Sequence, residues 1–269
     1  MRRAKRIASS LAIMAAAVLG VAAAQDPVSV SEIMQKNFEA TILPATVARY
    51  TFTLTDKSGS SMVRKVYSAT KLLNGTHHNR RLSRFEYPID AKGISSLIVE
   101  QETGPDDLWV YLPALKKARR LIADNKKDSF MGTDLSYADV IGYPPERWTH
   151  TLNGESAERG LPCWSITSVP KEESLREQTG YSKRESCIDE KSYVALWVTF
   201  YDLQGKAVKR VDAKIIDQVP HTPGKYVVRS LRAENLIDGH VTQITADQFS
   251  AAKALPDDAF TEAALENAQ

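Results

Sequence analysis

Residues 106–122 read DDLWVYLPALKKARRLI, and residues 130–139 read FMGTDLSYAD. In the first segment, Asp107–Leu112 is filled by aromatic and aliphatic residues and is expected to form a strand. Lys116–Ile122 is expected to form its partner after a turn at Pro113-Ala114. Apolar residues fall on both faces of the first strand, whereas a half-buried strand alternates apolar with polar residues. The pattern indicates that helices or a ligand cover the second face, or that these are central strands beneath loops.

The same two-faced apolar pattern recurs in Tyr193–Tyr201, and turn signals punctuate the rest of the chain. Asn153-Gly154, Asp202–Gly205 and Asp238-Gly239 each separate two runs of strand-like residues, as in β-hairpins. We expect about eleven strands, mostly antiparallel to their chain neighbours. Strands of this number and length curl into a barrel or a strongly twisted open sheet.

Three short helices are expected among these strands. Ser29-Val30-Ser31-Glu32 has the pattern of a capping box, and Pro44 ends the apolar stripe that follows it. Residues 131–141 are expected to form a second helix with Thr133 or Asp134 as its cap, and this helix is a candidate lid. Residues 257–265 are expected to form the last helix.

The N-terminal segment has the three parts of a secretory signal peptide. A basic region is followed by a short apolar run, Leu11–Ala23, and by small residues at Ala22-Ala23-Ala24. The apolar run is shorter than the roughly 20 residues that cross a bilayer as a helix. We therefore expect residues 1–24 to be removed, with retention as an N-terminal anchor as the alternative. The basic residues of the segment are Arg2, Arg3, Lys5 and Arg6.

Removal of that segment changes the charge of the protein. The whole chain has 35 basic and 33 acidic residues, and loss of four basic residues leaves 31 against 33, a net charge of −2. This balance gives no indication of nucleic-acid binding. The remaining residues, 25–269, contain no linker-like or repeated segment, so we expect them to form one domain.

Cys163 and Cys187 are the two cysteines of the chain. An exported protein meets an oxidising compartment, where two cysteines in strand-like segments are expected to pair. A redox-active pair and a metal site are the alternatives, although the first usually has CxxC spacing and the second needs more ligands.

Three segments give the chain a resemblance to a known family: RFEYPIDAKG at residues 84–93, DDLWVYLPALKKARRL from residue 106, and FMGTDLSYAD. The chain resembles the outer-membrane lipoprotein-sorting proteins, which are relatives of the LolA and LolB carriers. The resemblance implies a curved antiparallel half-barrel with helices over its concave face and an apolar cavity for acyl chains. It also implies an inner-membrane RND-type exporter as a partner, because members of that branch often occur beside such exporters.

A cavity of this kind would be lined by apolar and aromatic residues. Burial of each methylene group of a lipid contributes about 0.8 kcal/mol, and methionine and aromatic side chains adapt to mixed acyl chains. Plain core packing is the alternative for each candidate. The candidates for the lipid cavity are Tyr50, Phe52, Leu54, Leu97, Trp109, Tyr111, Leu112, Phe130, Met131 and Tyr137.

A basic cluster, defined here as Lys116, Lys117, Arg119 and Arg120, follows the apolar run of the opening segment. One interpretation is transient contact with anionic headgroups or an acidic partner. The other is a charged edge strand that prevents edge-to-edge aggregation. By resemblance alone, Arg49 in the first expected strand corresponds to a cavity arginine that contacts lipid.

Sequence motifs of common enzyme classes are absent: the chain has no GxSxG, HExxH, P-loop or dinucleotide fingerprint. Asp134 and Asp139 form a carboxylate pair that general acid–base catalysis could use, but a capped helix explains them as well. The adjacent His77 and His78 would point to opposite faces of a strand and would not chelate one ion. The sequence predicts no catalytic residue, no metal site and no cofactor.

These observations predict a soluble periplasmic carrier, not an enzyme. It would shield the acyl chains of a lipid or lipoprotein and move them towards the outer membrane, as part of outer-membrane biogenesis. The alternative is a scaffold or accessory protein of an envelope export complex, with a filled core and no cargo. The sequence predicts no particular oligomeric state.

Overall fold

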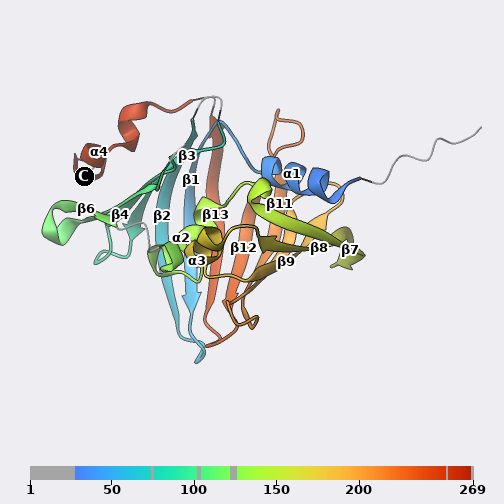
Figure 1. Ribbon diagram of the computed structural model, residues 1–269. Helices are drawn as coiled ribbons and strands as arrows, with labels where there is room; N and C mark the ends of the chain where they lie inside the picture. Colours follow the sequence, from blue (N-terminus) through green and yellow to red (C-terminus); the bar gives the residue numbers. More distant parts are fainter. Residues whose placement is uncertain (1–27, 74–75, 102–103, 122–125, 253, 268–269) are drawn as a thin grey trace, which may run out of the picture.

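A computed structural model describes residues 28–73, 76–101, 104–121, 126–252 and 254–267. The expected signal peptide, residues 1–24, lies outside these ranges. Within them, the chain forms one 13-stranded antiparallel sheet and four short α-helices (Figure 1). The mainly β, open and curved architecture agrees with the sequence-based prediction. The structure has thirteen strands where about eleven were expected.

The strands are β1 Ala45–Thr55, β2 Ser61–Leu72, β3 Asn79–Tyr87, β4 Ser95–Val99, β5 Asp107–Leu112, β6 Lys117–Leu121, β7 Trp148–Glu158, β8 Leu161–Pro170, β9 Lys183–Asp189, β10 Ala195–Tyr201, β11 Ala207–Gln218, β12 Tyr226–Asn235 and β13 Val241–Ala252. The α-helices are α1 Val30–Ala40, α2 Tyr137–Ile141, α3 Glu173–Thr179 and α4 Glu262–Asn267. Short 3-10 turns are η1 Pro113–Leu115, η3 Phe130–Gly132, η4 Pro145–Arg147 and η5 Asp257–Phe260.

The order of strands in the sheet determines what covers it. The order is β6-β5-β4-β3-β2-β1-β13-β12-β11-β10-β9-β8-β7, so the first and last strands pair at the centre. The chain leaves the centre, reaches one edge at β6 and resumes at the opposite edge with β7. Residues 126–147, which connect these edges, therefore have to cross one face of the sheet. We call this segment the crossing connection; it contains η3, α2 and η4.

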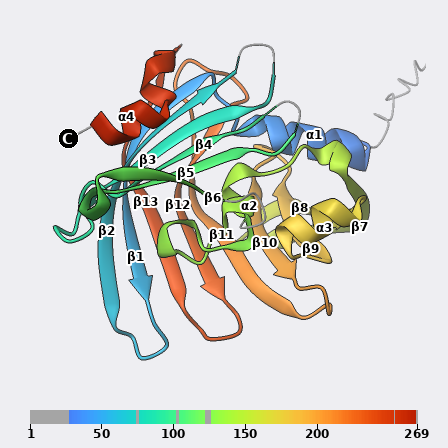
Figure 2. The ribbon, with the colours of Figure 1, turned by 60° about the vertical axis from the view of Figure 1, so that its left-hand side comes forward.

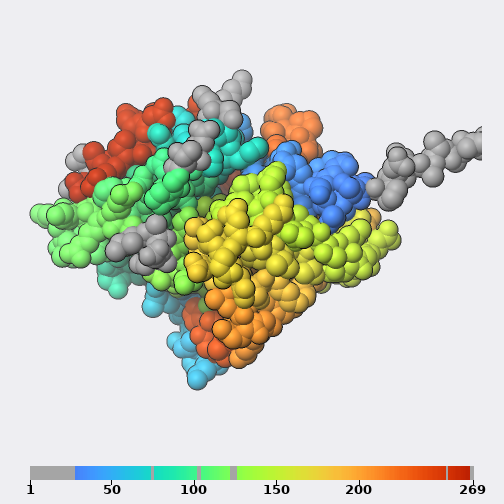
Figure 3. All heavy atoms as spheres, in the orientation of Figure 1, coloured from blue at the N-terminus to red at the C-terminus, as the bar shows by residue number. Residues whose placement is uncertain are grey.

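The helices divide between the two faces of the sheet. Figures 1 and 2 show α1, α2 and α3 together over the concave side, while α4 lies apart from them near β3 to β6. On the convex face, Phe260 and Leu265 of the C-terminal segment are buried against Ala69, Leu82 and Leu97. Helices thus cover both faces of β4 and β5, which explains their two-faced apolar pattern. In the space-filling view, α3 and the crossing connection close over the strands behind them (Figure 3).

The expected cap of α1 agrees with the structure, whereas the helix expected over residues 131–141 differs from it. Ser29 caps α1 as expected, because its Oγ accepts a hydrogen bond from the Glu32 backbone N–H at 3.2 Å. The expected helix over residues 131–141 is interrupted, since Met131 and Gly132 have positive φ angles. α2 starts after Ser136, which forms a capping box with Asp139. Neither Thr133 nor Asp134, the two caps that the sequence indicated, is therefore the cap of α2.

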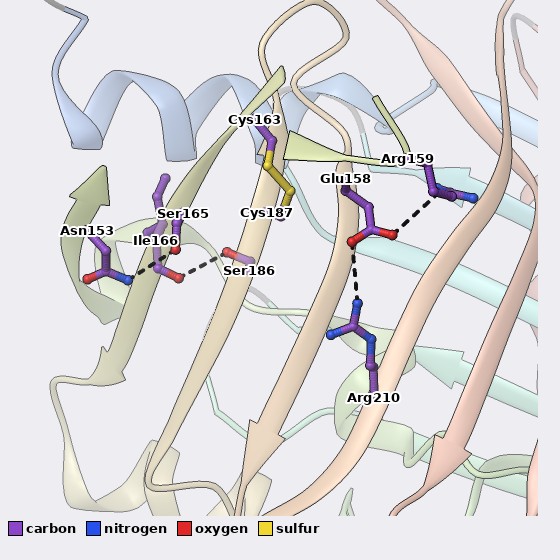
Figure 4. Close-up of a disulfide and its surroundings, with 9 residues drawn as sticks. All are labelled: Asn153, Glu158, Arg159, Cys163, Ser165, Ile166, Ser186, Cys187 and Arg210. Atoms are coloured by element: carbon purple, nitrogen blue, oxygen red, sulfur yellow. Dashed lines mark hydrogen bonds and ion pairs between the residues drawn. A yellow bond between two sulfur atoms is a disulfide. The ribbon is translucent and has the colours of Figure 1, made fainter. Parts of the chain in front are cut away.

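The two cysteines form a disulfide, as predicted (Figure 4). Cys163 of β8 and Cys187 of β9 have Cα atoms 5.5 Å apart, and both side chains are buried beside Leu196. The bond joins the neighbouring strands β8 and β9, and β8 pairs with the edge strand β7.

Replacing both cysteines with serine is expected to lower the free energy of unfolding by roughly 3 kcal/mol, because the bridge closes a loop in the unfolded chain. The loop length follows from the separation of 24 residues between Cys163 and Cys187. Urea unfolding of the variant and of the oxidised protein measures the difference. Equal midpoints for the two proteins would contradict a stabilising role.

Candidate functional site

A hollow of about 1160 Å³ lies between the concave face and the helices above it. Its size is slightly above the range of pockets for small molecules, which measure roughly 300–1,000 Å³. Strands at the centre of the sheet form its floor, and α1 and the crossing connection form its roof. The apolar part of the floor includes Tyr50, Phe52, Val66, Leu231, Ile244 and Phe249.

The floor is apolar because alternate residues of each central strand point to the concave face. In β1, Thr46, Tyr50 and Phe52 line the hollow, while Val47 packs on the convex face. Phe52 is buried with Val66 of β2 and Ile244 of β13, which are strands paired directly with β1. Three adjacent strands therefore present a continuous apolar surface.

Polar side chains of the strands hold the roof. At one end, Arg64 donates to the Met131 carbonyl at 2.5 Å, and Asp134 Oδ2 accepts from Thr242 at 2.6 Å and lies 2.7 Å from His240 Nδ1. At the other, Arg81 Nη1 donates to the Val140 carbonyl at 2.6 Å.

Asp139 of α2 makes the most buried of these attachments. Its Oδ2 lies 2.5 Å from Lys209 Nζ, and the hydroxyl of Tyr181 donates to its Oδ1 at 3.0 Å. The side chains of Asp139 and Lys209 are 6% and 12% exposed. Burial raises the pKa of Tyr181, so this hydroxyl remains a donor. The crossing connection is thus fixed to the strands by ion pairs and hydrogen bonds, in addition to the apolar packing of Phe130 and Tyr137 against β4 and β5.

Ionisable groups gather at one end of the hollow. Lys126 and Asp106 form a buried ion pair of 2.7 Å, and Arg81 and Arg184 line the wall. Glu100 is buried there, and its Oε2 accepts from the Asn79 backbone N–H at 2.9 Å. Burial raises the pKa of Glu100 from 4.5 to about 7.

Replacing Glu100 with Gln is expected to stabilise the protein above pH 7, because the folded state no longer has to ionise a buried carboxyl. The pKa is higher folded than unfolded, so the cost to stability grows as pH rises from 4.5 to 7 and is absent below 4.5. Above pH 7, the free energy of unfolding of the variant is expected to exceed that of the unmodified protein by at most about 3 kcal/mol. Thermal unfolding across this range measures it, and a constant difference at all pH values would contradict the assignment.

The geometry can be compared with known proteins. A family model described as "Uncharacterized protein" matches residues 77–267, which is more than two thirds of the chain. The chain belongs to this family. No curated protein matches it.

Solved structures share the fold. An outer membrane lipoprotein-sorting protein domain from Vibrio parahaemolyticus has a TM-score of 0.80 and 23% identity, covering 88% of this chain and 98% of that domain. A DUF1329 family protein from Desulfovibrio piger has a TM-score of 0.79 and 23% identity, and the match covers 87% of this chain and 97% of that protein. A LolA superfamily protein from Nitrosomonas europaea has a TM-score of 0.67 and 15% identity, and the match covers 87% of this chain and 98% of that protein. The chain therefore has a LolA-like fold, as its sequence segments indicated.

Three of the ten predicted cavity residues line the hollow of this LolA-like fold: Tyr50, Phe52 and Phe130. Three more adjoin it. Leu54 and Met131 pack in the cluster around Phe52, and Tyr137 packs edge-on against Phe130 at 5.5 Å between ring centres. Any contact of these residues with lipid remains a prediction.

The other predicted cavity residues lie elsewhere. Leu97, Trp109 and Tyr111 pack on the convex face against the C-terminal segment, and Leu112 is half-buried at the end of β5. The alternate residues of β5 point to the concave side, where Leu108 packs with Phe130. The two-faced pattern was interpreted correctly, but α4 and η5 cover the face that these aromatic residues occupy.

The predicted cavity arginine, Arg49, also lies on the convex side. Its guanidinium pairs with Glu86 at 3.1 Å and lines a shallow depression with Tyr67 and Arg84. The arginines that do line the hollow are Arg81, Arg147 and Arg184. The sequence contained a signal that Arg81 faces the hollow. Arg81, Ser83 and Phe85 lie two residues apart in one strand and therefore share a face, and Phe85 packs in the cluster around Phe52.

The basic cluster lies at one end of the sheet. Lys117, Arg119 and Arg120 belong to β6, an edge strand, and Lys116 occupies the left-handed turn before it. All four side chains are exposed, and Arg120 pairs with Asp107 of the neighbouring strand. This placement fits a charged edge strand, and contact with headgroups or a partner remains a prediction.

Across the described ranges, no helix is both long and apolar enough to cross a membrane. Within the same ranges, no group of three or more His, Cys, Asp or Glu residues is placed to hold a metal ion.

Proposed function

We propose that this protein is a periplasmic carrier that holds the acyl chains of a lipid or lipoprotein in the concave hollow and moves them towards the outer membrane. The observation that carries the proposal is the hollow itself, about 1160 Å³ with an apolar floor across three central strands. A neighbouring structure named for lipoprotein sorting has the same fold. The residues proposed to contact cargo are Tyr50, Phe52 and Phe130, with Leu54, Met131 and Tyr137 behind them.

The energetics of lipid transfer favour such a site. Each methylene group moved from water into an apolar hollow contributes about 0.8 kcal/mol, so a single acyl chain supplies most of the affinity required. A carrier also has to release its cargo. The crossing connection is suited to open, because directional polar contacts such as Asp139 with Lys209 fix it to the strands. Opening exchanges these contacts for contacts with water.

Export is part of the proposal. Residues 1–24 have the pattern of a signal peptide, and the disulfide between Cys163 and Cys187 suits an oxidising compartment. We propose residues 25–269 as one carrier domain without catalytic activity. An inner-membrane RND-type exporter is the proposed donor of cargo, and the basic cluster is the proposed point of contact with anionic headgroups.

Native mass spectrometry of protein purified from the periplasm without detergent tests the carrier function. The expected result is a reproducible adduct with the mass of a lipid or lipoprotein, which organic extraction removes and identifies. A mass equal to that of the protein alone, together with no uptake of lipid from added vesicles, would favour the scaffold hypothesis.

Reversal of the basic cluster to four glutamates is expected to slow lipid transfer to anionic vesicles at least about tenfold, since each basic residue near such a surface contributes about 1 kcal/mol. Bound cargo should remain, because the cluster lies away from the hollow. Transfer of labelled lipid to vesicles measures the effect.

A matched control variant reverses four other exposed lysines: Lys57, Lys171, Lys191 and Lys206. It changes the net charge by the same amount at other places on the surface. Equal slowing in the two variants would show that only net charge matters, and would leave the basic cluster as an edge guard.

A further inference from the structure

Arg184 is a cation in the wall of the hollow without an anionic partner. It belongs to β9, and its guanidinium lies over the indole ring of Trp148, 4.1 Å from the ring centre. Among the described residues, its side chain forms neither an ion pair nor a hydrogen bond. Guanidinium groups removed from bulk water are normally paired with carboxylates or hydrogen-bond acceptors.

Arg210 provides an internal comparison. Its guanidinium also lies over an indole ring, 4.5 Å from the centre of Trp197. However, its Nε donates to Asp212 at 3.2 Å, and it does not line the hollow. Stacking on tryptophan therefore does not by itself explain why Arg184 has no anion.

The electrostatic environment of Arg184 reflects this difference. Loss of solvent lowers the pKa of its guanidinium to about 10, so the group is still charged at neutral pH but is poorly compensated. Asp139 is the carboxylate that acts on it from a distance, and Asp139 is already bonded to Lys209 and Tyr181.

Tyr143 is a second residue in the lining of the hollow whose polar group has no partner among the described residues. The residue is 9% exposed, and its buried hydroxyl forms no hydrogen bond with the described residues. Tyr143 packs in the same buried cluster as Trp148, the ring beneath Arg184. Burial raises its pKa, so the hydroxyl remains a donor. Lys126 and Arg147 lie near its ring, 5.7 and 5.4 Å from the centre.

Arg81 adds a cation to the wall from β3. It donates to Thr70 and to the Val140 carbonyl, and it forms no ion pair with the described residues. Glu100 acts on it through space, but burial favours the neutral form of that carboxyl. The other cations of this region, Lys126 and Arg147, are paired with Asp106 and Glu172. The hollow thus has an excess of positive charge at its polar end.

We propose that the cargo carries an anionic group, a carboxylate or a phosphate ester, which pairs with Arg184 and accepts a hydrogen bond from Tyr143 while its acyl chains lie on the apolar floor. This inference rests on the proposed carrier function and narrows it to anionic amphiphiles. An acylated polypeptide terminus has no charge at its lipid end and would leave Arg184 unpaired.

Binding of matched amphiphiles to the mature protein, freed of bound lipid, tests this proposal. Dodecanoate, dodecyl phosphate and dodecanol have the same chain and differ in the headgroup, and inorganic phosphate supplies the anion without the chain. The two anionic amphiphiles are expected to bind about tenfold or more tightly than dodecanol, as for a hydrogen bond between charged groups.

Two variants locate the effect. Arg184→Gln is expected to remove the preference for anionic headgroups and to leave the affinity for dodecanol unchanged. Arg210→Gln is expected to retain the preference, because this arginine lies outside the hollow. If both variants lost the preference for anionic headgroups to the same extent, Arg184 would not be the residue that pairs with the headgroup. The comparison of headgroups in the unmodified protein applies even if Arg184→Gln does not fold.

The outcomes separate this inference from the carrier function. If the unmodified protein binds dodecanol as tightly as dodecanoate, the anionic subsite is refuted and the carrier function stands. If none of the three amphiphiles binds, the carrier function fails and the inference fails with it. Binding of inorganic phosphate as tight as that of dodecyl phosphate would overturn an amphiphile as the occupant.

Discussion

Asp139→Ala is expected to lower the free energy of unfolding by about 3 kcal/mol or more, because it leaves the buried ammonium of Lys209 without its carboxylate. The pair is 2.5 Å apart, and both side chains are almost fully buried. The variant also removes the acceptor for the Ser136 backbone N–H in the capping box of α2. Chemical denaturation measures the loss.

A double-mutant cycle separates the ion pair from the cap. Asp139→Ala with Lys209→Met is expected to be less destabilised than Asp139→Ala alone, since no uncompensated charge remains. Glu32→Ala serves as a control, because Glu32 pairs with Lys36 at an exposed position and such pairs contribute less than about 1 kcal/mol. If Asp139→Ala cost no more than Glu32→Ala, the crossing connection would not depend on this contact.

Leu231→Asp is expected to reduce bound lipid at least about tenfold while the fold persists, because acyl chains cannot solvate a carboxylate and burial of an unpaired charge is costly. Leu231 lies on β12, is half-buried and lines the hollow floor beside Ile244. Lipid extraction after purification, followed by mass spectrometry, quantifies the cargo retained per protein molecule.

The matched control is Ile215→Asp. Ile215 belongs to the neighbouring strand β11, opposite Ser230, and is 51% exposed outside the hollow. It makes the same chemical change one strand away and should leave lipid content unchanged. Equal lipid content in Leu231→Asp and in the unmodified protein would show that acyl chains do not lie on this floor.

Local features of the fold were determined by short segments of sequence. Ser29 caps α1 because its side chain satisfies a free backbone N–H three residues later, which is a purely local effect. The hairpin turn at Asp202–Gly205 and the pairing of Cys163 with Cys187 also followed from the sequence. The presence of apolar residues on both faces of β5 correctly indicated a strand that is covered on both sides.

Only the tertiary structure decided which face of each strand points to the hollow. A period of two separates the residues of β5 into two sets, but it does not say which set points to the hollow. Trp109 and Tyr111 pack against Phe260 and Leu265, whose position depends on where the end of the chain returns. Sequence reasoning assigned these aromatic residues to the hollow because it could not place the C-terminal segment.

The hollow itself arises from contacts between residues far apart in the sequence. Pairing of β1 with β13 places β6 and β7 at opposite edges, and this arrangement forces residues 126–147 across the concave face. Arg184 lines the hollow because strand pairing places β9 between β8 and β10 in the sheet. Arg49 lies on the convex face because alternate residues of β1 point to opposite faces. The sequence by itself determined the strands, the Ser29 cap of α1 and the disulfide, because residues close to one another along the chain set them. Only the tertiary structure decided which side chains meet in the hollow, because long-range strand pairing sets that.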